Sequence, residues 1–215
     1  MKVFVIAMNN EAECVISNLE NVVESELYGR RIVRGTLNGE DAFVVVSGVG
    51  KSNAAAATQL AIQETGAKMI YNLGVSGGLD PAMRVGDIYE VANAVQYDFD
   101  LVQINGTEMG TLNERDTPLI PCRAEGRFAA KTLGTGDRFN DSADDSALLK
   151  RLGASLRDME GAAIAHVCET AGVELVSYKC ISDVEGSGSM PEQYMENLKK
   201  CLSILTDFSK TLFMV

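Results

Sequence analysis

The 215-residue chain contains no tryptophan, four prolines and a single histidine, His166. One histidine cannot supply a histidine-rich metal site, and none of the five cysteines stands in Cys-x-x-Cys spacing. Both absences argue against a zinc site of the usual kind. The odd number of cysteines is also unlike a disulfide framework, and it favours free thiols in a reducing cytoplasm.

Basic residues are scarce: 19 Lys and Arg stand against 30 Asp and Glu, a net charge of −11. A surface this acidic repels phosphate backbones and anionic lipids, so we expect no nucleic-acid polymer and no membrane as partner. No apolar run approaches the roughly 20 residues of a membrane span. The short apolar start Val3–Met8 leads directly to Glu11, so we expect no signal peptide and a soluble, cytoplasmic protein.

What is present is typical of a globular domain, with 46% hydrophobic and 23% charged residues. We expect a single domain over residues 1–215, because this length can bury a full core. Strand-like segments alternate with helical ones, which predicts an α/β fold with a mostly parallel sheet. Asn38-Gly39 between two apolar runs predicts an early antiparallel hairpin.

The patterns define most element positions. Glycine turns at 47–50 and 74–78 are each expected to break a strand, and Gly66 to end a helix. In the last helix an apolar stripe that begins at Tyr194 is interpreted as core. The expected strands are 3–8, 26–36, 41–47, 68–73, 88–97, 133–137, 156–158 and 173–182, and the expected helices are 11–19, 51–65, 143–152, 160–171 and one from 189 onward.

Ligands of such sheets bind beyond the carboxyl ends of the strands. The segments that follow the expected strands hold two glycine turns, one aromatic residue and several carboxylates. They are Met8-Asn9-Asn10-Glu11, Ser47-Gly48-Val49-Gly50, Gly74–Gly78, Gly136-Asp137-Arg138-Phe139, Asp158-Met159-Glu160 and Ser182-Asp183. We therefore expect the functional site at this edge of the sheet.

Six motifs in this order resemble the nucleoside phosphorylase superfamily, and most closely its 5′-methylthioadenosine/S-adenosylhomocysteine nucleosidase family. They are Ala7-Met8 with Glu11, Ser47-Gly48-Val49-Gly50-Lys51, Ser76-Gly77-Gly78-Leu79 with Val85-Gly86-Asp87-Ile88, Gly136-Asp137 with Phe139, Met159-Glu160 with Ala163 to Cys168, and Ile181-Ser182-Asp183-Val184. The resemblance implies a three-layer α/β/α fold with a central mixed, twisted sheet. It also implies a small-molecule nucleoside substrate, no metal or organic cofactor, and a homodimer, for which segment 100–122 is the candidate contact.

The reaction of that family is the cleavage by water of the bond between adenine and ribose, through a transition state like an oxocarbenium ion. The leaving base needs a proton, the water needs a base, and the ribose hydroxyls need acceptors. The resemblance assigns these roles to Asp183, Glu11 and Glu160, respectively. From the residues alone, a helix cap or a surface loop explains Asp183 better than an acid does, and the two glutamates fit the acidic first turns of helices.

The resemblance places further residues around the substrate. Phe139 would stack on the base, the backbone of Asn140 would bond the adenine edge, and Met159 would lie against the sugar. Two groups complete the expected site: Ser76 and Gly77 near base and ribose, and Gly48, Val75 and Lys179 on the side of the attacking water.

The chain departs from the family pattern on the water side. Val75 replaces a usual serine and Lys179 a usual arginine, and the connection over 118–138 is about one helix shorter. Because Lys179 alternates with Ile181 and Asp183, we expect it to share a strand face with the acid.

Water is favoured over phosphate as the nucleophile. The stretch Tyr71–Gly74 lacks the arginine that purine phosphorylases carry there, and Glu11 would repel a phosphate dianion. Lys51 does not complete a phosphate-loop pattern and is interpreted as a solvent-exposed residue at a helix start. The alternatives that remain are a nucleoside phosphorylase, a futalosine-type nucleosidase and an inactive nucleoside-binding protein.

Overall fold

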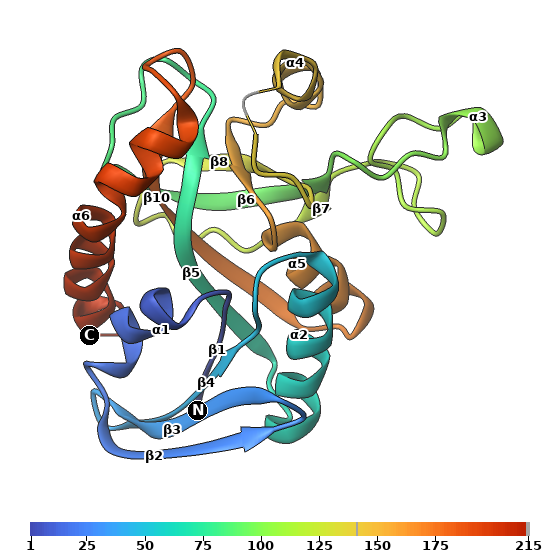
Figure 1. Cartoon of the computed structure of the whole chain (residues 1–215). Helices are drawn as coiled ribbons and strands as arrows, with labels where there is room; N and C mark the ends of the chain where they lie inside the picture. Colours follow the sequence, from blue (N-terminus) through green and yellow to red (C-terminus); the bar gives the residue numbers. More distant parts are fainter. Residues whose placement is uncertain (141, 214–215) are drawn as a thin grey trace.

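The computed structural model describes residues 1–140 and 142–213. One mixed sheet forms its centre, with strand order β10-β6-β8-β9-β5-β1-β4-β3-β2 and β7 attached to β6 (Figure 1). The strands are β1 (Lys2–Ile6), β2 (Glu20–Leu27), β3 (Arg30–Leu37), β4 (Glu40–Val46), β5 (Met69–Gly78), β6 (Ile88–Gln96), β7 (Ile120–Pro121), β8 (Ala130–Thr135), β9 (Leu156–Asp158) and β10 (Glu174–Val184). The helices are α1 (Asn9–Ile16), α2 (Lys51–Thr65), α3 (Val102–Asn105), α4 (Ala143–Arg151), α5 (Gly161–Thr170) and α6 (Met190–Thr211).

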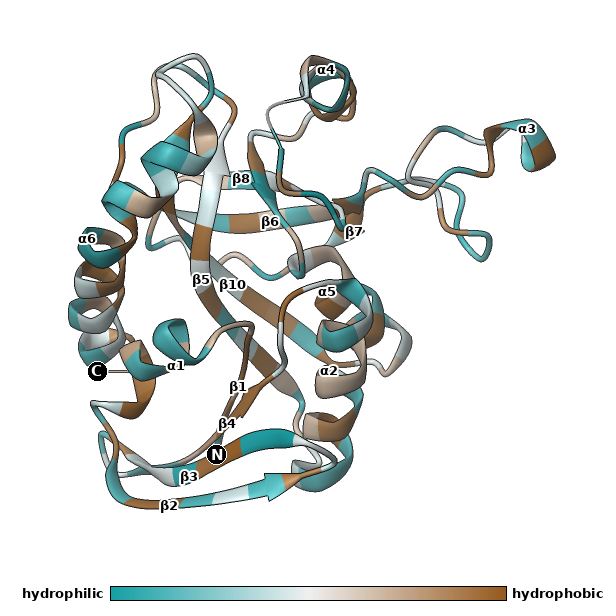
Figure 2. Ribbon diagram, in the orientation of Figure 1, coloured by the Kyte–Doolittle hydropathy of each residue, from teal (hydrophilic) through white to brown (hydrophobic). Residues whose placement is uncertain are grey.

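Helices cover the sheet on both faces, which confirms the expected three-layer α/β/α architecture (Figure 1). Along β1, Val3 and Val5 join the core under α2 and α5, while Phe4 and Ile6 join the core under α1 and α6. A strand buried on both faces is apolar at successive positions, as parallel strands usually are. Figure 2 shows the same pattern as a continuous apolar band through the central strands.

The part of the sheet near the carboxyl end of β5 closes on itself. β10 pairs with both β5 and β6, and β9 pairs with both β5 and β8, so these five strands form a complete circuit. The circuit brings residues from β5, β9 and β10 to one place although they are far apart in the sequence.

The N-terminal strands contain two hairpins where the sequence predicts one. The turn at Asn38-Gly39 is confirmed, with both residues at positive φ. The continuous strand expected over 26–36 is wrong, because Tyr28 and Gly29, with φ of 50° and 72°, turn the chain between β2 and β3. β2 is exposed along most of its length, so it lacks the apolar alternation that would have identified it.

The expected break of β5 at residues 74–78 is also wrong, since the strand continues to Gly78. Its glycines permit close approach rather than a turn. A Cβ atom on Gly74 would lie 2.7 Å from Oε1 of Glu11, and one on Gly77 would lie 2.8 Å from Oδ1 of Asp183. The other glycine segment behaves as predicted: β4 ends at Val46, and α2 runs from Lys51 to a left-handed Gly66.

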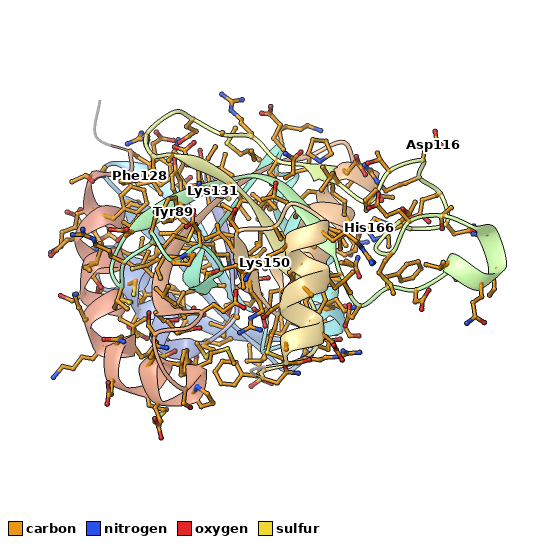
Figure 3. All side chains as sticks on the ribbon, turned by 90° about the horizontal axis from the view of Figure 1, so that it is seen from above. Tyr89, Asp116, Phe128, Lys131, Lys150 and His166 are labelled. Atoms are coloured by element: carbon orange, nitrogen blue, oxygen red, sulfur yellow. The ribbon has the colours of Figure 1, made fainter. Side chains whose placement is uncertain are left out.

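Between β6 and β8 the chain leaves the body as an arm, residues 100–118, that carries α3 (Figure 1). Ile104 on this arm is 80% exposed. In Figure 3 His166 lies where the arm meets α5, and its Nε2 is 2.6 Å from Oε1 of Glu114. Among the described residues, no helix is both long enough and apolar enough to cross a membrane.

Candidate active site

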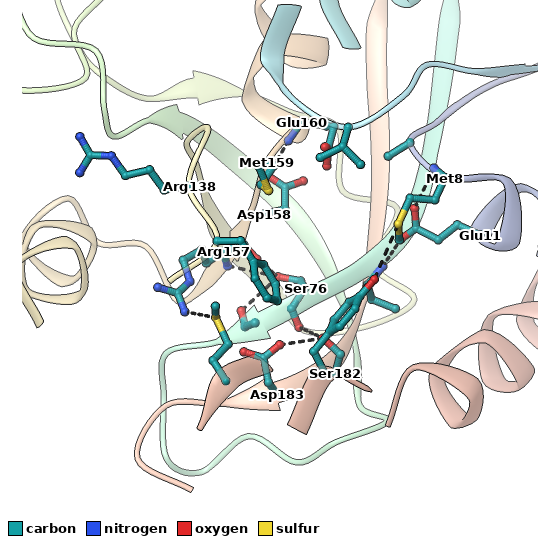
Figure 4. A pocket seen from close by; sticks show the side chains of 17 residues that line it. Met8, Glu11, Ser76, Arg138, Arg157, Asp158, Met159, Glu160, Ser182 and Asp183 are labelled. Atoms are coloured by element: carbon teal, nitrogen blue, oxygen red, sulfur yellow. Dashed lines mark hydrogen bonds between the residues drawn. The ribbon is translucent and has the colours of Figure 1, made fainter. Parts of the chain in front are cut away.

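A pocket of about 400 Å³ opens at the end of the sheet where β1, β5, β9 and β10 finish (Figure 4). Eight of the residues expected in the site line it: Glu11, Val75, Ser76, Gly77, Phe139, Met159, Glu160 and Asp183. Gly48, Asn140 and Lys179 are not among its lining residues. The pocket thus brings together the three expected carboxylates, Glu11, Glu160 and Asp183, which come from three different elements.

Glu11 lies in the first turn of α1 and is 4% exposed. Its Oε1 accepts a hydrogen bond of 2.8 Å from the N–H of Val75, and its Oε2 accepts one of 3.3 Å from the N–H of Met8. Burial raises the pKa of Glu11, although the charge of Lys179 and the two backbone donors oppose the shift. A carboxylate with a raised pKa is a stronger proton acceptor near neutral pH.

Glu160 precedes α5 and is 8% exposed. Its Oε1 accepts a hydrogen bond of 2.7 Å from the N–H of Gly50, which stands at φ +99° in the turn after β4. Burial, followed by the negative charge of Asp158, raises the pKa of Glu160 to about 7. The carboxyl group therefore changes its charge within the physiological pH range.

Lys179 points into the wall behind the pocket rather than onto its surface. Its Nζ lies 2.9 Å from Oδ2 of Asp158, and both side chains are less than 5% exposed. Asp158 also accepts hydrogen bonds from the Oγ1 of Thr135 at 2.6 Å and the N–H of Gly161 at 2.9 Å. Burial opposes the charged ammonium, but the carboxylates of Asp158, Glu11 and Glu160 outweigh it and raise the pKa of Lys179.

Asp183 reaches the pocket through a β-bulge. The pairing of β10 with β5 shifts between Ile181 and Asp183, so Ser182 and Asp183 both line the pocket. The Oγ of Ser182 donates a hydrogen bond of 2.8 Å to Oδ2 of Asp183. Bulges commonly re-aim side chains beside active sites. The expected alternation from Lys179 through Ile181 therefore does not extend to Asp183.

Two aromatic rings stand at the mouth of the pocket. Phe139 is 51% exposed and packs edge-on against Tyr194, with ring centroids 5.4 Å apart. Tyr194 belongs to the stripe of α6 that the sequence assigns to the core, and that assignment is wrong for this residue. Helical spacing alone does not distinguish a residue that faces a neighbouring helix from one that faces a cavity.

The sequence analysis assigns no role to four further lining residues: Arg138, Arg157, Asp158 and Met190. Arg138 and Asp158 belong to segments expected at this edge of the sheet, whereas Arg157 is predicted only as part of a short strand end. Arg138 forms an ion pair of 2.8 Å with Asp145, whereas Met190 begins α6. The position of Arg138 beside Phe139 and of Asp158 beside Met159 is the sequence signal that could have identified these two residues, and Met190 has no such signal.

The expected role of Asn140 belongs to its backbone, and its side chain donates to Asp145 at 3.3 Å. The prediction for Lys51 is wrong. Lys51 is not a solvent-exposed residue, because its Nζ is 2.5 Å from Asp98, and side-chain exposures are 18% and 11%. Gly48 donates its N–H to the carbonyl of Ala7 at 3.0 Å and so joins two loops at the edge of the site.

Within the described residues, no group of three or more His, Cys, Asp or Glu side chains is arranged to hold a metal ion. The carboxylates of the pocket are instead occupied by backbone N–H groups, Lys179 and hydroxyl groups. The chemistry that this arrangement offers is proton transfer and hydrogen bonding to a neutral polar ligand.

Comparison with known proteins agrees with this arrangement. Residues 2–213 match the family model of the phosphorylase superfamily. A 5′-methylthioadenosine/S-adenosylhomocysteine nucleosidase of Halalkalibacterium halodurans is 33% identical over 199 residues, which is 84% of each chain. The nucleosidase of that name from Neisseria meningitidis, solved with methylthio-immucillin-A, superposes with a TM-score of 0.87 at 25% identity and 98% coverage of both chains.

A third relative, the corresponding nucleosidase of Colwellia psychrerythraea in complex with adenine, has a TM-score of 0.84 at 27% identity, and the match covers 97% of this chain and 95% of that one. The similarity in both sequence and fold therefore extends over nearly the whole chain. The protein belongs to the phosphorylase superfamily and, within it, to the family of 5′-methylthioadenosine/S-adenosylhomocysteine nucleosidases.

Proposed function

We propose that this protein hydrolyses the N-glycosidic bond of adenine nucleosides such as 5′-methylthioadenosine and S-adenosylhomocysteine, and releases adenine. The observation that carries the proposal is the meeting of Glu11, Glu160 and Asp183 around one pocket of about 400 Å³. The names and ligands of the relatives support the same substrate class.

Each carboxyl group has a separate task in this reaction. Asp183 donates a proton to N7 of the leaving adenine, and the electron pair of the C1′–N9 bond moves into the base. Glu160 accepts hydrogen bonds from the ribose hydroxyls and stabilises the positive charge that develops on the sugar. Glu11 takes a proton from the water that bonds to C1′, and its raised pKa suits that task.

Water fits the site better than phosphate does. Two of the cations near the pocket are already paired, Lys179 with Asp158 and Arg138 with Asp145. A phosphate dianion next to Glu11 would also lie near the carboxylates of Asp158 and Glu160. Among the described residues, no unpaired cation is available on that side of the pocket. The phosphorylase alternative is therefore the weaker one on electrostatic grounds.

We further propose that residues 1–215 form one nucleosidase domain, which acts as a homodimer in the cytoplasm. The arm 100–118 supports the dimer, because it leaves the body and exposes Ile104 and Val102, at 80% and 41%. Five free cysteines support a reducing compartment.

The test is release of adenine from 5′-methylthioadenosine and S-adenosylhomocysteine, with and without phosphate. We expect adenine to be released at the same rate with and without phosphate, together with the free thio-ribose. Strict dependence on phosphate would identify a phosphorylase instead. No release of adenine, with nucleoside binding retained, would identify a binding protein or an enzyme for a different nucleoside such as futalosine.

A further inference from the structure

One cation of the pocket has no carboxylate partner within the described part of the chain. Arg157 lines the pocket and is half-buried, yet none of the ion pairs includes it. Among the described residues, the side-chain partner of its guanidinium is the thioether of Met190, a weak acceptor. A guanidinium carries five N–H donors, so most of its hydrogen-bonding capacity is not used by the described side chains and is available to a ligand.

The strand register fixes where this group lies. Gly77 of β5 pairs with Asp183 of β10 on one side and with Arg157 of β9 on the other. Directly paired residues project to the same face of a sheet. Asp183 and Arg157 therefore flank a position without a side chain, with their Cα atoms two strand spacings, roughly 10 Å, apart.

The backbone of Arg157 is held firmly in this position. The Oγ of Ser76 donates to the carbonyl of Arg157 at 2.9 Å and lies 3.1 Å from its N–H. In Figure 4 the guanidinium lies at the opposite end of the pocket from Glu11, on the side of Asp183. It is therefore at the end where the proposed function puts the base, and away from the attacking water.

Asp183 and Arg157 differ in the hydrogen bonds that they can form with a purine. Beyond the proton it gives to N7, the carboxyl group of Asp183 offers a second oxygen that accepts a hydrogen bond, which suits a 6-amino group. A guanidinium only donates hydrogen bonds, and arginine is the side chain that commonly binds the edge of a purine with an oxygen at C6. A site with both groups has a partner for either substituent.

We infer that Arg157 is a specificity residue that extends the substrate range to nucleosides whose purine carries an oxygen at C6. This inference rests on the proposed hydrolase function and goes beyond it, because it predicts release of hypoxanthine as well as adenine. A hydrogen bond to the oxygen also stabilises the leaving base as charge moves onto it, so the effect is on turnover as well as binding.

The experiment compares the kcat/KM for 5′-methylthioadenosine with that for its 6-oxo counterpart, 5′-methylthioinosine. The variants are Arg157→Met, which keeps the length of the side chain, and Arg157→Lys, which keeps the charge without the fork. Arg151→Met, on the exposed surface of α4, is the matched control for loss of one positive charge. Thermal unfolding of each variant shows that the fold is intact.

We expect the wild type to release both bases, and Arg157→Met to lower the ratio of 6-oxo to 6-amino kcat/KM by roughly tenfold or more. Arg157→Lys should give an intermediate ratio, and Arg151→Met an unchanged one. Release of adenine without hypoxanthine, or a ratio that Arg157→Met does not change, would overturn the inference and leave the hydrolase function standing.

If the wild type releases neither base, the hydrolase function fails, and calorimetry with free adenine and free hypoxanthine decides the inference separately. Weaker binding of hypoxanthine alone in Arg157→Met would support it, whereas equal weakening of both bases would overturn it.

Discussion

Lys179 and Asp158 form a buried ion pair in the wall of the pocket, with 2.9 Å between Nζ and Oδ2. The pair joins β10 to the end of β9, immediately before α5. The carboxylate of Asp158 also accepts hydrogen bonds from the Oγ1 of Thr135 and from the N–H of Gly161, the first residue of α5. Lys179, which the resemblance puts at the place of a usual arginine, is therefore paired with a buried carboxylate and is not directed at open solvent.

Removing one member of the pair should destabilise the protein strongly. Lys179→Met leaves Asp158 charged and buried, and we expect a loss of about 3–5 kcal/mol in the free energy of unfolding. Urea denaturation measures this change in the free energy of unfolding.

The double variant Lys179→Met/Asp158→Asn should recover part of the loss. As a control, Lys150→Met removes one member of an exposed ion pair with Glu185 and should lower the free energy of unfolding by less than about 1 kcal/mol. A small loss in Lys179→Met would mean that the pair is not a structural element.

The acid assignment predicts the effect of Asp183→Asn. The amide cannot donate an acidic proton to N7, so kcat should fall by roughly 10²–10⁴-fold. The fold should persist, because asparagine keeps the size and the hydrogen bond with Ser182. Steady-state kinetics measures the loss, and thermal shift with substrate checks that binding is retained. A kcat close to that of the wild type would remove Asp183 from the mechanism.

Gly77→Ala tests the same acid without changing its chemistry. The new Cβ would lie 2.8 Å from Oδ1 of Asp183, so the carboxyl group must move. We expect kcat to fall by about tenfold or more, as small displacements of catalytic groups do. Gly126→Ala is the control, because it adds a Cβ in open space at φ +77° and should affect stability alone. Equal kinetics in Gly77→Ala and the wild type would contradict the placement of the acid.

The raised pKa of Glu160, about 7, predicts opposite effects of pH on activity and stability. The ionised form is the one that binds ribose in our proposal, so kcat/KM should fall as the pH drops through 7. The folded protein binds the proton more tightly than the unfolded chain, whose value is near 4.5. This group therefore stabilises the fold fully below pH 4.5, and its contribution is lost as the pH rises to about 7.

Rate profiles and unfolding curves between pH 5 and 8, with and without Glu160→Gln, measure both effects. Because glutamine does not titrate, the variant should lose the part of each pH dependence that belongs to this group. If the variant and the wild type share the same slopes, the titrating group is another one.

The sequence predicts most of the fold, because a run of alanines and the closing Gly66 identify α2, and apolar segments identify the buried strands. Prediction from the sequence fails where one residue type can serve two different structural purposes. Glycines that suggest a turn in β5 instead make room for the side chains of Glu11 and Asp183. The exposed strand β2 has no apolar pattern to recognise.

The candidate site shows the same limit. Glu11, Glu160 and Asp183, which belong to the family motifs, line the pocket, and their roles stay predictions. Arg157 and Tyr194 were not found, because a charged residue on a short strand and an aromatic residue in a helical stripe have common structural explanations. Their positions depend on pairings between β5, β9 and β10 that a single sequence does not reveal.

The closed circuit of β5, β10, β6, β8 and β9 also determines how the molecule opens. A strand within the circuit is paired on both sides and has no open edge, so we expect its amides to exchange with solvent more slowly than those of an edge strand. Asp183, Gly77 and Arg157 all lie on strands of this circuit. Glu11 stands instead on the eight-residue helix α1, which packs on α6. We therefore expect the adenine end of the site to unfold locally less often than the end that holds Glu11.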